Sequence, residues 1–301
     1  MIKTNSLQAW FLAARPKTLT SAAAPVIVAL ASGHHLYGSI NWLPALLCLL
    51  FAFLMQIDAN LINDYFDCIG GIDTKERLGP ERACSQGWVT LKAMRLAIGA
   101  VTILACVTGM PLILWGGWEC ILVGLCCITF CFLYTTLFSK IALGDILVFM
   151  FFGIIPVGYT FFFQSSYKSI LDIPIGIWYL ALAQGLVTDC LLLINNFRDR
   201  ETDRQANKIT LVTIIGTRAA KGLYASVGII ACILAHLGIS KLSNVPSVYH
   251  FIPFMFLPIH IVILKQMHDI DHGSKLNRVL GITAMSIFVF SVLILITFLI
   301  V

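Results

Sequence analysis

The stretch QIDANLINDYFDCIGGID at residues 56–73 places a run of carboxylate and carboxamide side chains at the end of an otherwise apolar segment. The oxygen-bearing side chains of its second part are Asn60, Asn63, Asp64, Asp67 and Asp73. On an α-helix the first four recur every three or four residues, so the spacing predicts that they share one face. Carboxylates this close repel one another unless a cation lies among them, and so many hard oxygen ligands favour Mg²⁺ or Ca²⁺.

A second stretch, NNFRDRETD at residues 195–203, repeats this arrangement at the end of another apolar run. Its Asn195, Asp199 and Asp203 are spaced four residues apart and therefore also share one helical face. Two acidic clusters at the ends of two membrane helices can hold Mg²⁺ between them only if a polyanion supplies further ligands and offsets the charge, and a diphosphate is the natural candidate. The two stretches together predict a site for Mg²⁺ and a diphosphate.

The composition is that of a membrane protein. Of the 301 residues, 59% are hydrophobic and 12% are charged, whereas about a quarter of the residues of a soluble domain are charged. Basic loops at one membrane face explain the formal net charge of +5, so we expect a lipid bilayer around the chain and no nucleic acid as a partner. Most of the ten cysteines lie in or beside apolar runs and no C-x-x-C pair occurs, which predicts neither disulfides nor a zinc site.

The apolar runs predict the fold class, an all-α membrane protein with one bundle of transmembrane helices. Nine runs have the length needed to span a bilayer, at residues 18–37, 43–63, 95–114, 119–138, 142–163, 175–195, 212–236, 251–267 and 279–301. The eighth run is short and contains Pro253 and Pro258, which permit a break within the membrane. No linker or soluble segment interrupts the runs, so we expect one domain over residues 1–301.

The distribution of basic residues predicts the orientation in the membrane. Only Lys168 and Lys241 of the 20 Lys and Arg residues fall on one side of the nine predicted spans, which leaves 18 on the other. Because loops rich in Lys and Arg stay in the cytoplasm, this asymmetry predicts a cytoplasmic N-terminus, a C-terminus outside, and both acidic stretches at the cytoplasmic face.

The paired motifs NDYFDCIGGID and NNFRDRETD resemble those of the UbiA-type intramembrane prenyltransferases, nine-helix enzymes that move an isoprenoid from its diphosphate to an acceptor. The spacing before Asp73 is similar to that of the branch acting on 1,4-dihydroxy-2-naphthoate in menaquinone synthesis. Further stretches agree with that branch over residues 14 to about 216, namely ARPKTL at 14–19, LGPERA at 78–83, LYT at 133–135, LGD at 143–145, FFGIIPVG at 151–158 and TLVTIIG at 210–216.

The resemblance implies a reaction and, with the residue chemistry above, a set of site residues. A polyprenyl diphosphate would prenylate 1,4-dihydroxy-2-naphthoate with loss of CO₂, giving a demethylmenaquinol, at the cytoplasmic side of a bacterial-type inner (plasma) membrane. The expected catalytic residues are Asp64, Asp67, Asp73, Asp199 and Asp203. The expected Mg²⁺ ligands are Asn63, Asp64, Asp67, Asp199 and Asp203. The expected diphosphate contacts are Arg15, Lys140, Arg198 and Lys208, and those to the acceptor or its surroundings are Asn60, Arg82, Tyr134 and Asn195.

Two alternatives remain open from the sequence. One is a UbiA-type enzyme with another aromatic acceptor, such as 4-hydroxybenzoate. The other is a cation-coupled secondary transporter, which the deep acids Asp58 and Asp189 would permit, although the acidic stretches gather at one face and transporter sites lie near the midplane. The basic side chains at the membrane ends would also suit a simpler role, in which they reach out to lipid headgroups.

Overall fold

The computed structural model of the chain describes residues 2–71, 78–242 and 246–300, apart from the side chain of Lys140. Within these residues the chain forms helices and no strands, and an isolated bridge joins Ile141 to Ile209. The α-helices are α1 (Leu7–Ala14), α2 (Leu19–Tyr37), α3 (Trp42–Ile69), α4 (Leu91–Gly109), α5 (Ile113–Gly116), α6 (Glu119–Thr136), α7 (Gly144–Phe149), α8 (Ile155–Gln164), α9 (Ile175–Gln205), α10 (Leu211–Lys241), α11 (Leu257–Ile270) and α12 (Leu276–Leu299).

Short 3₁₀ or π segments join several of these helices into longer units. They are η1 (Pro16–Thr18), η2 (Met110–Leu112), η3 (Phe138–Lys140), the π segment η4 (Met150–Ile154), η5 (Ile170–Asp172) and η6 (Ser247–Phe256). Counted with these joints, nine helical units of the described residues are long and apolar enough to cross a membrane. The predicted fold class is therefore confirmed.

Both helices that carry the acidic motifs are longer than the sequence predicted. The second predicted span ended at residue 63 and the sixth at residue 195, whereas α3 continues to Ile69 and α9 to Gln205. Neither extension contains a proline or a glycine, so nothing breaks the backbone hydrogen-bond ladder before Gly70 and Ala206. Both acidic stretches are therefore held on rigid helix where the helices leave the apolar region.

The eighth span contains the break that its prolines permit. Pro253 lies inside the 3₁₀ segment η6, and Pro258 occupies the first turn of α11. A proline in the first turn of a helix is tolerated because the amide it lacks would have no partner within the helix. The span thus changes from 3₁₀ to α-helical geometry at Leu257.

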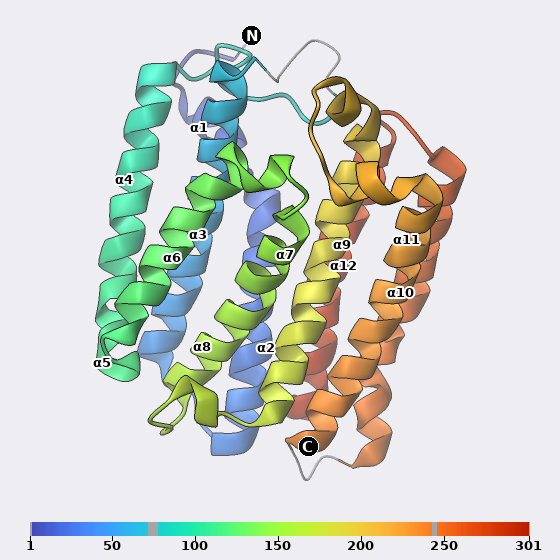
Figure 1. Ribbon diagram of the computed structural model, residues 1–301. Helices are drawn as coiled ribbons and strands as arrows, with labels where there is room; N and C mark the ends of the chain where they lie inside the picture. The colour runs from blue at the N-terminus through green and yellow to red at the C-terminus, as the bar shows by residue number, and fades with distance from the viewer. Residues whose placement is uncertain (1, 72–77, 243–245, 301) are drawn as a thin grey trace.

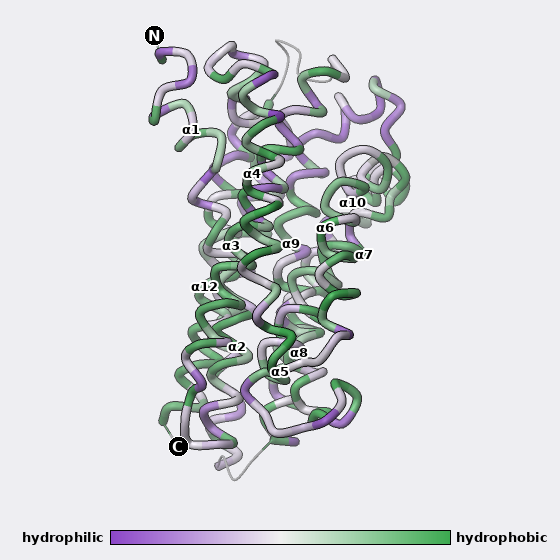
Figure 2. Tube along the Cα trace, turned by 90° about the vertical axis from the view of Figure 1, so that its left-hand side faces the viewer, coloured by the Kyte–Doolittle hydropathy of each residue, from purple (hydrophilic) through white to green (hydrophobic). Residues whose placement is uncertain are grey.

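The helices run along the length of the bundle, and α9 has the most central place (Figure 1). It packs against α2, α7, α8, η4, α10 and α12. Figure 2 shows hydrophilic residues gathered at the end of the bundle that holds the N-terminus, with apolar residues along the middle. Both α3 and α9 deliver their acidic C-terminal turns to this polar end (Figures 1 and 2).

Glycines bring η4 and α9 into backbone contact. A Cβ atom added to Gly153 would lie 2.5 Å from the carbonyl oxygen of Ala181, and one added to Gly185 would lie 2.8 Å from that of Phe149. Small residues allow membrane helices to approach this closely, and the approach gains van der Waals contact where lipid provides no hydrophobic drive. The contact fixes α7, which precedes η4, against the middle of α9.

Candidate active site

One large cavity of about 1480 Å³ runs through the bundle. Along α3 it is lined by residues that recur at helical spacing, and Gly70 follows directly after the helix; the residues on α3 are Cys48, Phe51, Ala52, Met55, Gln56, Ala59, Asn60, Asn63 and Asp67. The part of α3 from Cys48 to Asp67 is about 28 Å long at the rise of an α-helix. The cavity therefore extends over most of the thickness of a bilayer's hydrocarbon core.

The lining of the cavity changes from polar to apolar along its length. The polar end holds Arg15, Asn60, Asn63, Asp67, Arg82, Tyr134, Asp145, Asn195, Arg198, Asp199, Asp203 and Lys208. Farther along, aromatic and aliphatic side chains such as Phe151, Phe152, Ile155 and Phe163 form the walls. A ligand that matches this lining has a charged head and a long apolar tail.

Most of the residues predicted from the sequence meet in this cavity. Those that line it are Arg15, Asn60, Asn63, Asp67, Arg82, Tyr134, Asn195, Arg198, Asp199, Asp203 and Lys208. The exceptions are Asp64, Asp73 and Lys140. Asp73 lies outside the described residues, and of Lys140 only the backbone, at the end of η3, is described.

Asp64 does not line the cavity, although the sequence placed it with the metal ligands. It is 1% exposed, and its two carboxylate oxygens accept N–H groups from Ala83 at 2.9 Å and Cys84 at 3.0 Å. The cavity-facing residues of α3 are centred near Asn63, and the next residue is turned by about 100° around the helix. Asp64 consequently anchors the loop that carries Arg82.

Each acid of the two motifs that lines the cavity is paired with a basic side chain. The guanidinium of Arg82 donates to Asp67 at 2.6 Å, and Lys208 Nζ lies 3.3 Å from Asp203 Oδ1. Arg198 donates through Nε and Nη2 to both oxygens of Asp199, at 2.7 and 2.5 Å. These pairs offset charges that would otherwise repel within a partly dehydrated space.

Arg198 is also part of a hydrogen-bond chain that joins three regions of the molecule. It is 3% exposed and donates to Asn195 Oδ1 and Asn277 Oδ1, both at 2.8 Å. Asn277, on the first turn of α12, in turn donates to the carbonyl oxygen of Leu78 at 2.7 Å. Asn277 was not predicted from the sequence, because it is a single amide in an apolar segment and belongs to no recognised motif.

The asparagines of α3 hold neighbouring segments around the polar end. Asn60 is 4% exposed and donates to Ala14 O at 3.0 Å and to Thr18 Oγ1 at 2.9 Å. The junction that it holds includes Arg15, which adopts a positive φ of 51° where α1 ends. Asn63 accepts a hydrogen bond from Thr135 of α6. These contacts fix the positions of Arg15 and α6 relative to the first acidic motif.

The oxygen atoms at the polar end suit a hard divalent cation. Asn63, Asp67, Asp199 and Asp203 present carboxylate or amide oxygens to one cavity, and Asp203 Oδ2 is buried without a hydrogen-bond partner among the described residues. Within that same part of the chain, no three His, Cys, Asp or Glu side chains form a ready metal site. Basic side chains lie against the acids instead, so cation binding requires these pairs to rearrange.

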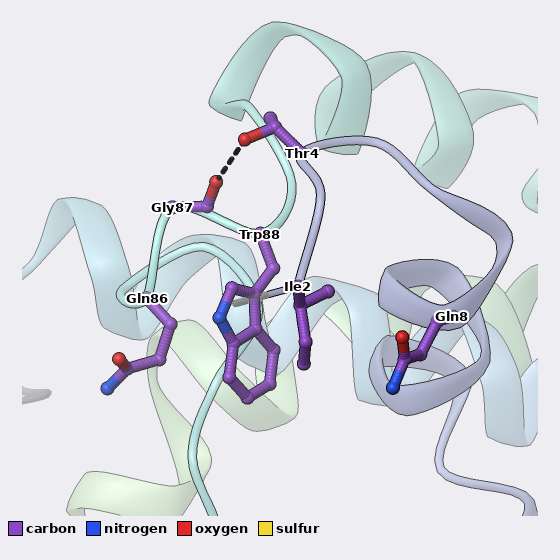
Figure 3. Close-up of a pocket in the computed structure, with 6 residues that line it drawn as sticks. All are labelled: Ile2, Thr4, Gln8, Gln86, Gly87 and Trp88. Carbon is purple, nitrogen blue, oxygen red and sulfur yellow. Dashed lines mark hydrogen bonds between the residues drawn. The ribbon is translucent and has the colours of Figure 1, made fainter.

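A second cavity of about 520 Å³ lies near the N-terminus, between the start of the chain and the turn before α4 (Figure 3). It is lined by Ile2, Thr4, Gln8, Gln86, Gly87 and Trp88, and Thr4 Oγ1 donates to the carbonyl oxygen of Gly87 at 3.1 Å. None of these side chains is charged or a strong metal ligand. The cavity that joins the two acidic motifs is therefore the candidate active site.

Comparison with known proteins gives matches over most of the chain. The model of the UbiA prenyltransferase family matches residues 22–299. The 1,4-dihydroxy-2-naphthoate octaprenyltransferase of Escherichia coli (strain K12) is 33% identical over 86% of this chain and 83% of its own length. The enzyme of the same name from Mycobacterium tuberculosis (strain ATCC 25618 / H37Rv) is 32% identical over 76% of this chain and 77% of its own.

Solved structures share the fold at lower identity. The apo structure of a UbiA homolog from Aeropyrum pernix K1 superposes with a TM-score of 0.69 and 14% identity, covering 93% of this chain and 97% of that one. A UbiA homolog from Archaeoglobus fulgidus, bound to DMAPP and Mg²⁺, gives a TM-score of 0.61 and 14% identity over 95% and 98% of the two chains. These findings favour the enzyme over the secondary transporter. The chain belongs to the UbiA prenyltransferase family and is a multi-pass integral membrane prenyltransferase.

Proposed function

We propose that this enzyme transfers a polyprenyl group from its diphosphate to 1,4-dihydroxy-2-naphthoate, with loss of CO₂, to give a demethylmenaquinol. The observation that carries the proposal is the single cavity with a charged end and a long apolar remainder, which matches a diphosphate joined to an isoprenoid tail. The choice of acceptor is supported by the naphthoate octaprenyltransferases that are 32–33% identical over most of the chain.

The basic side chains of the polar end bind the diphosphate in this proposal. Arg82, Arg198 and Lys208 line the cavity and already face carboxylates, so their N–H groups lie where anionic oxygens are favoured. Donors of this kind stabilise the negative charge that develops on the diphosphate as its bond to the prenyl carbon breaks. Arg15 lines the same end and adds a fourth positive charge.

Asn63, Asp67, Asp199 and Asp203 are the residues that would hold Mg²⁺, because their oxygens line the polar end. Bound there, Mg²⁺ would supply Lewis-acid neutralisation of the leaving diphosphate. The four residues belong to α3 and α9, so they would bind it between two rigid helices. Asp64 acts indirectly by anchoring the loop of Arg82.

The apolar walls protect the reactive prenyl group. Phe151, Phe152 and Ile155 exclude water from the region beside the polar end, which prevents hydrolysis of an allylic cation. The ring carbon that bears the carboxylate attacks the prenyl carbon, and the bond between that ring carbon and the carboxylate then breaks. Its electron pair returns to the ring and CO₂ leaves, so an ionised acceptor needs no further reactant.

We further propose that the polar end faces the cytoplasm, with the N-terminus inside a bacterial-type plasma membrane and the C-terminus outside. The support is the excess of Lys and Arg on the side of the two motifs. Single cysteines placed in a cysteine-free variant report the side by labelling with an impermeant maleimide. A cysteine near residue 206 should be protected in intact cells and one near residue 168 should react. The reverse pattern would contradict this orientation.

The direct test of the reaction offers several acceptors to purified protein with one polyprenyl diphosphate and Mg²⁺. Mass spectrometry should find a prenylated product from 1,4-dihydroxy-2-naphthoate that has lost the mass of CO₂. Removal of Mg²⁺ by a chelator should stop the reaction, and its return should restore it. Preferential prenylation of 4-hydroxybenzoate would overturn the proposed acceptor and leave the family membership intact.

A further inference from the structure

Beside the motif residues, a second polar group lies at the same cavity, where Tyr134 and Asp145 line the wall and Asp189 is not part of the lining. Asp145 lies in the first turn of α7, Asp189 in the middle of α9, and Tyr134 near the end of α6. Gly144 is the meeting point of these helices, because a Cβ atom added to it would lie 3.4 Å from Tyr134 Cε2 and 3.4 Å from Leu192 Cδ2. Figure 1 shows α7 and α9 side by side, and the two helices are in contact.

One oxygen of each carboxyl group lacks a hydrogen-bond donor among the described residues. Asp145 lines the cavity and is only 9% exposed, and its Oδ1 has no hydrogen-bond partner among the described residues. Asp189 Oδ1 is likewise buried and without a partner in that part of the chain. The two groups are close enough to repel each other when charged. Buried acceptors without donors are rare in folded proteins, which indicates that a ligand supplies the donors.

The chemistry of this group indicates which part of the proposed substrates binds beside it: the diphosphate, the prenyl tail or the aromatic acceptor. A diphosphate is an anion and is repelled by two carboxylates, and a prenyl tail has no hydrogen-bond donor. The aromatic acceptor carries hydroxyl groups, which are donors. Tyr134 lies within electrostatic range of Asp145 and Asp189 and also of Asp67 and Asp203. A ring bound against Tyr134 is therefore next to the end of the cavity where the diphosphate leaves.

We propose that Asp145 receives a hydroxyl group of the aromatic acceptor, with the adjacent Asp189 completing the subsite and Tyr134 as an adjoining wall. This inference rests on the proposed function and adds the residues that orient the ring. A hydroxyl that donates to a carboxylate keeps its proton, and its oxygen releases more electron density into the ring. The attacking carbon becomes more nucleophilic, and no proton is gained or lost overall.

The test substitutes each aspartate by leucine, which has a similar shape and removes the acceptor oxygens. In purified protein, Asp145→Leu and Asp189→Leu should raise the KM for 1,4-dihydroxy-2-naphthoate about tenfold or more. The KM for the polyprenyl diphosphate should change less than twofold. Asp145→Asn and Asp189→Asn keep one acceptor oxygen and should give smaller increases. Because a buried acid is replaced by an apolar side chain in a membrane protein, the leucine variants should fold at least as well as the wild type.

Asp58→Leu is the matched control. Asp58 is 0% exposed on α3, accepts a hydrogen bond from Thr102 Oγ1 at 2.6 Å, and does not line the cavity. The same substitution there should leave the KM for the acceptor within twofold of the wild-type value. A rise in that constant equal to the rise in the Asp145 variant would overturn the inference, because it would reflect a general effect of losing a buried acid.

The decisive comparison uses 1-hydroxy-2-naphthoate, which lacks one hydroxyl group. The wild type should prefer the dihydroxy acceptor in kcat/KM, and Asp145→Leu or Asp189→Leu should lose most of that preference. If the wild type prenylates the dihydroxy acceptor and both leucine variants keep its full preference, the subsite is wrong while the proposed function stands. A wild-type protein that prenylates no naphthoate overturns the proposed function itself.

Discussion

The two acidic motifs occupy equivalent places at the ends of α3 and α9, yet their acids differ in use. On α9, Asp199 and Asp203 both line the cavity. On α3, Asp67 lines it, whereas Asp64 is buried against the amides of Ala83 and Cys84. Aspartates of similar motifs thus have two roles, and the direction in which the side chain leaves its helix decides which role each one has.

The two arginines of the second motif differ in the same way. Arg198 lines the cavity and holds Asp199. Arg200 is two residues further on and leaves the other side of the helix. It is 6% exposed and donates to the carbonyl oxygens of Phe197 and Asp271, both at 2.8 Å. One arginine of the pair serves the cavity and the other ties α9 to the turn before α12.

The largest effect should come from the acids that line the cavity. Asp67→Asn and Asp199→Asn keep the side-chain shape and remove a charge, and each should lower kcat by about a hundredfold to a thousandfold if transition-state electrostatics depend on it. Initial rates at saturating substrates and Mg²⁺ measure this. Asp172→Asn, at an exposed site in η5, is the control and should retain the wild-type rate. A near-normal rate for Asp67→Asn would remove the distinction between Asp67 and Asp64.

Asp64→Ala should mainly affect folding. Two buried amides would lose their acceptor, which costs about 1–3 kcal/mol for each buried group left unpaired. We expect a lower unfolding temperature and faster proteolysis near residues 83–84, with loss of activity that follows the loss of structure. Asp67→Asn should show the opposite division, with activity lost and stability kept. An Asp64→Ala protein that is inactive but fully stable would place Asp64 with the cavity residues.

Asn277 extends the comparison to a contact between distant parts of the chain. Asn277→Ala removes the bonds to Arg198 and to the carbonyl of Leu78 and should reduce kcat/KM for the polyprenyl diphosphate about thirtyfold, since one such bond contributes about 1 kcal/mol and two are lost. Asn277→Asp keeps an acceptor for Arg198 and loses the donor to Leu78. Its kcat/KM should therefore lie between those of the wild type and Asn277→Ala. Equal loss in both variants would assign the whole effect to the Leu78 contact.

The smallest effect should come from Asp271, which accepts hydrogen bonds from Arg200. The ammonium of Lys221 donates to Asp271 at 2.6 Å and holds the pKa of that carboxyl below its usual range. A carboxyl with a lowered pKa in the folded state stabilises the protein at neutral pH, and this contribution is lost as the pH falls below about 4. Because Asp271 is 45% exposed, Asp271→Asn should destabilise by less than about 1 kcal/mol at pH 7.

Thermal unfolding at pH 7 and at acidic pH measures this difference for the wild type and Asp271→Asn. The gap between the two proteins should narrow as the pH falls, and turnover at pH 7 should remain within twofold. A large loss of turnover in Asp271→Asn would show that the Arg200 side of α9 also supports the reaction, and the contrast between the two arginines would no longer hold.

Much of the candidate site was predictable because its signals are local. The motif spacings predicted which faces of α3 and α9 carry Asn60, Asn63, Asp67, Asp199 and Asp203, and these side chains do line one cavity. Asp64 was expected to face the cavity with the other acids and is instead buried against two backbone amides, because a spacing of three or four fixes neighbours on a helix but not the rotation of the helix within the bundle. Asp145 was part of a recognised motif, but nothing in the sequence linked it to Asp189.

The sequence by itself determined that the described residues hold nine helical segments able to span a membrane, because the transfer of apolar side chains into lipid is nearly additive along a segment. It also determined which residues could bind a metal and a diphosphate. The tertiary structure alone decided which of them meet. The bond between Arg198 and Asn277 joins residues 79 positions apart, and the contact of Gly153 with Ala181 places α7 against α9. Such pairings depend on how helices rotate and pack against one another, a property that no single segment of the chain encodes.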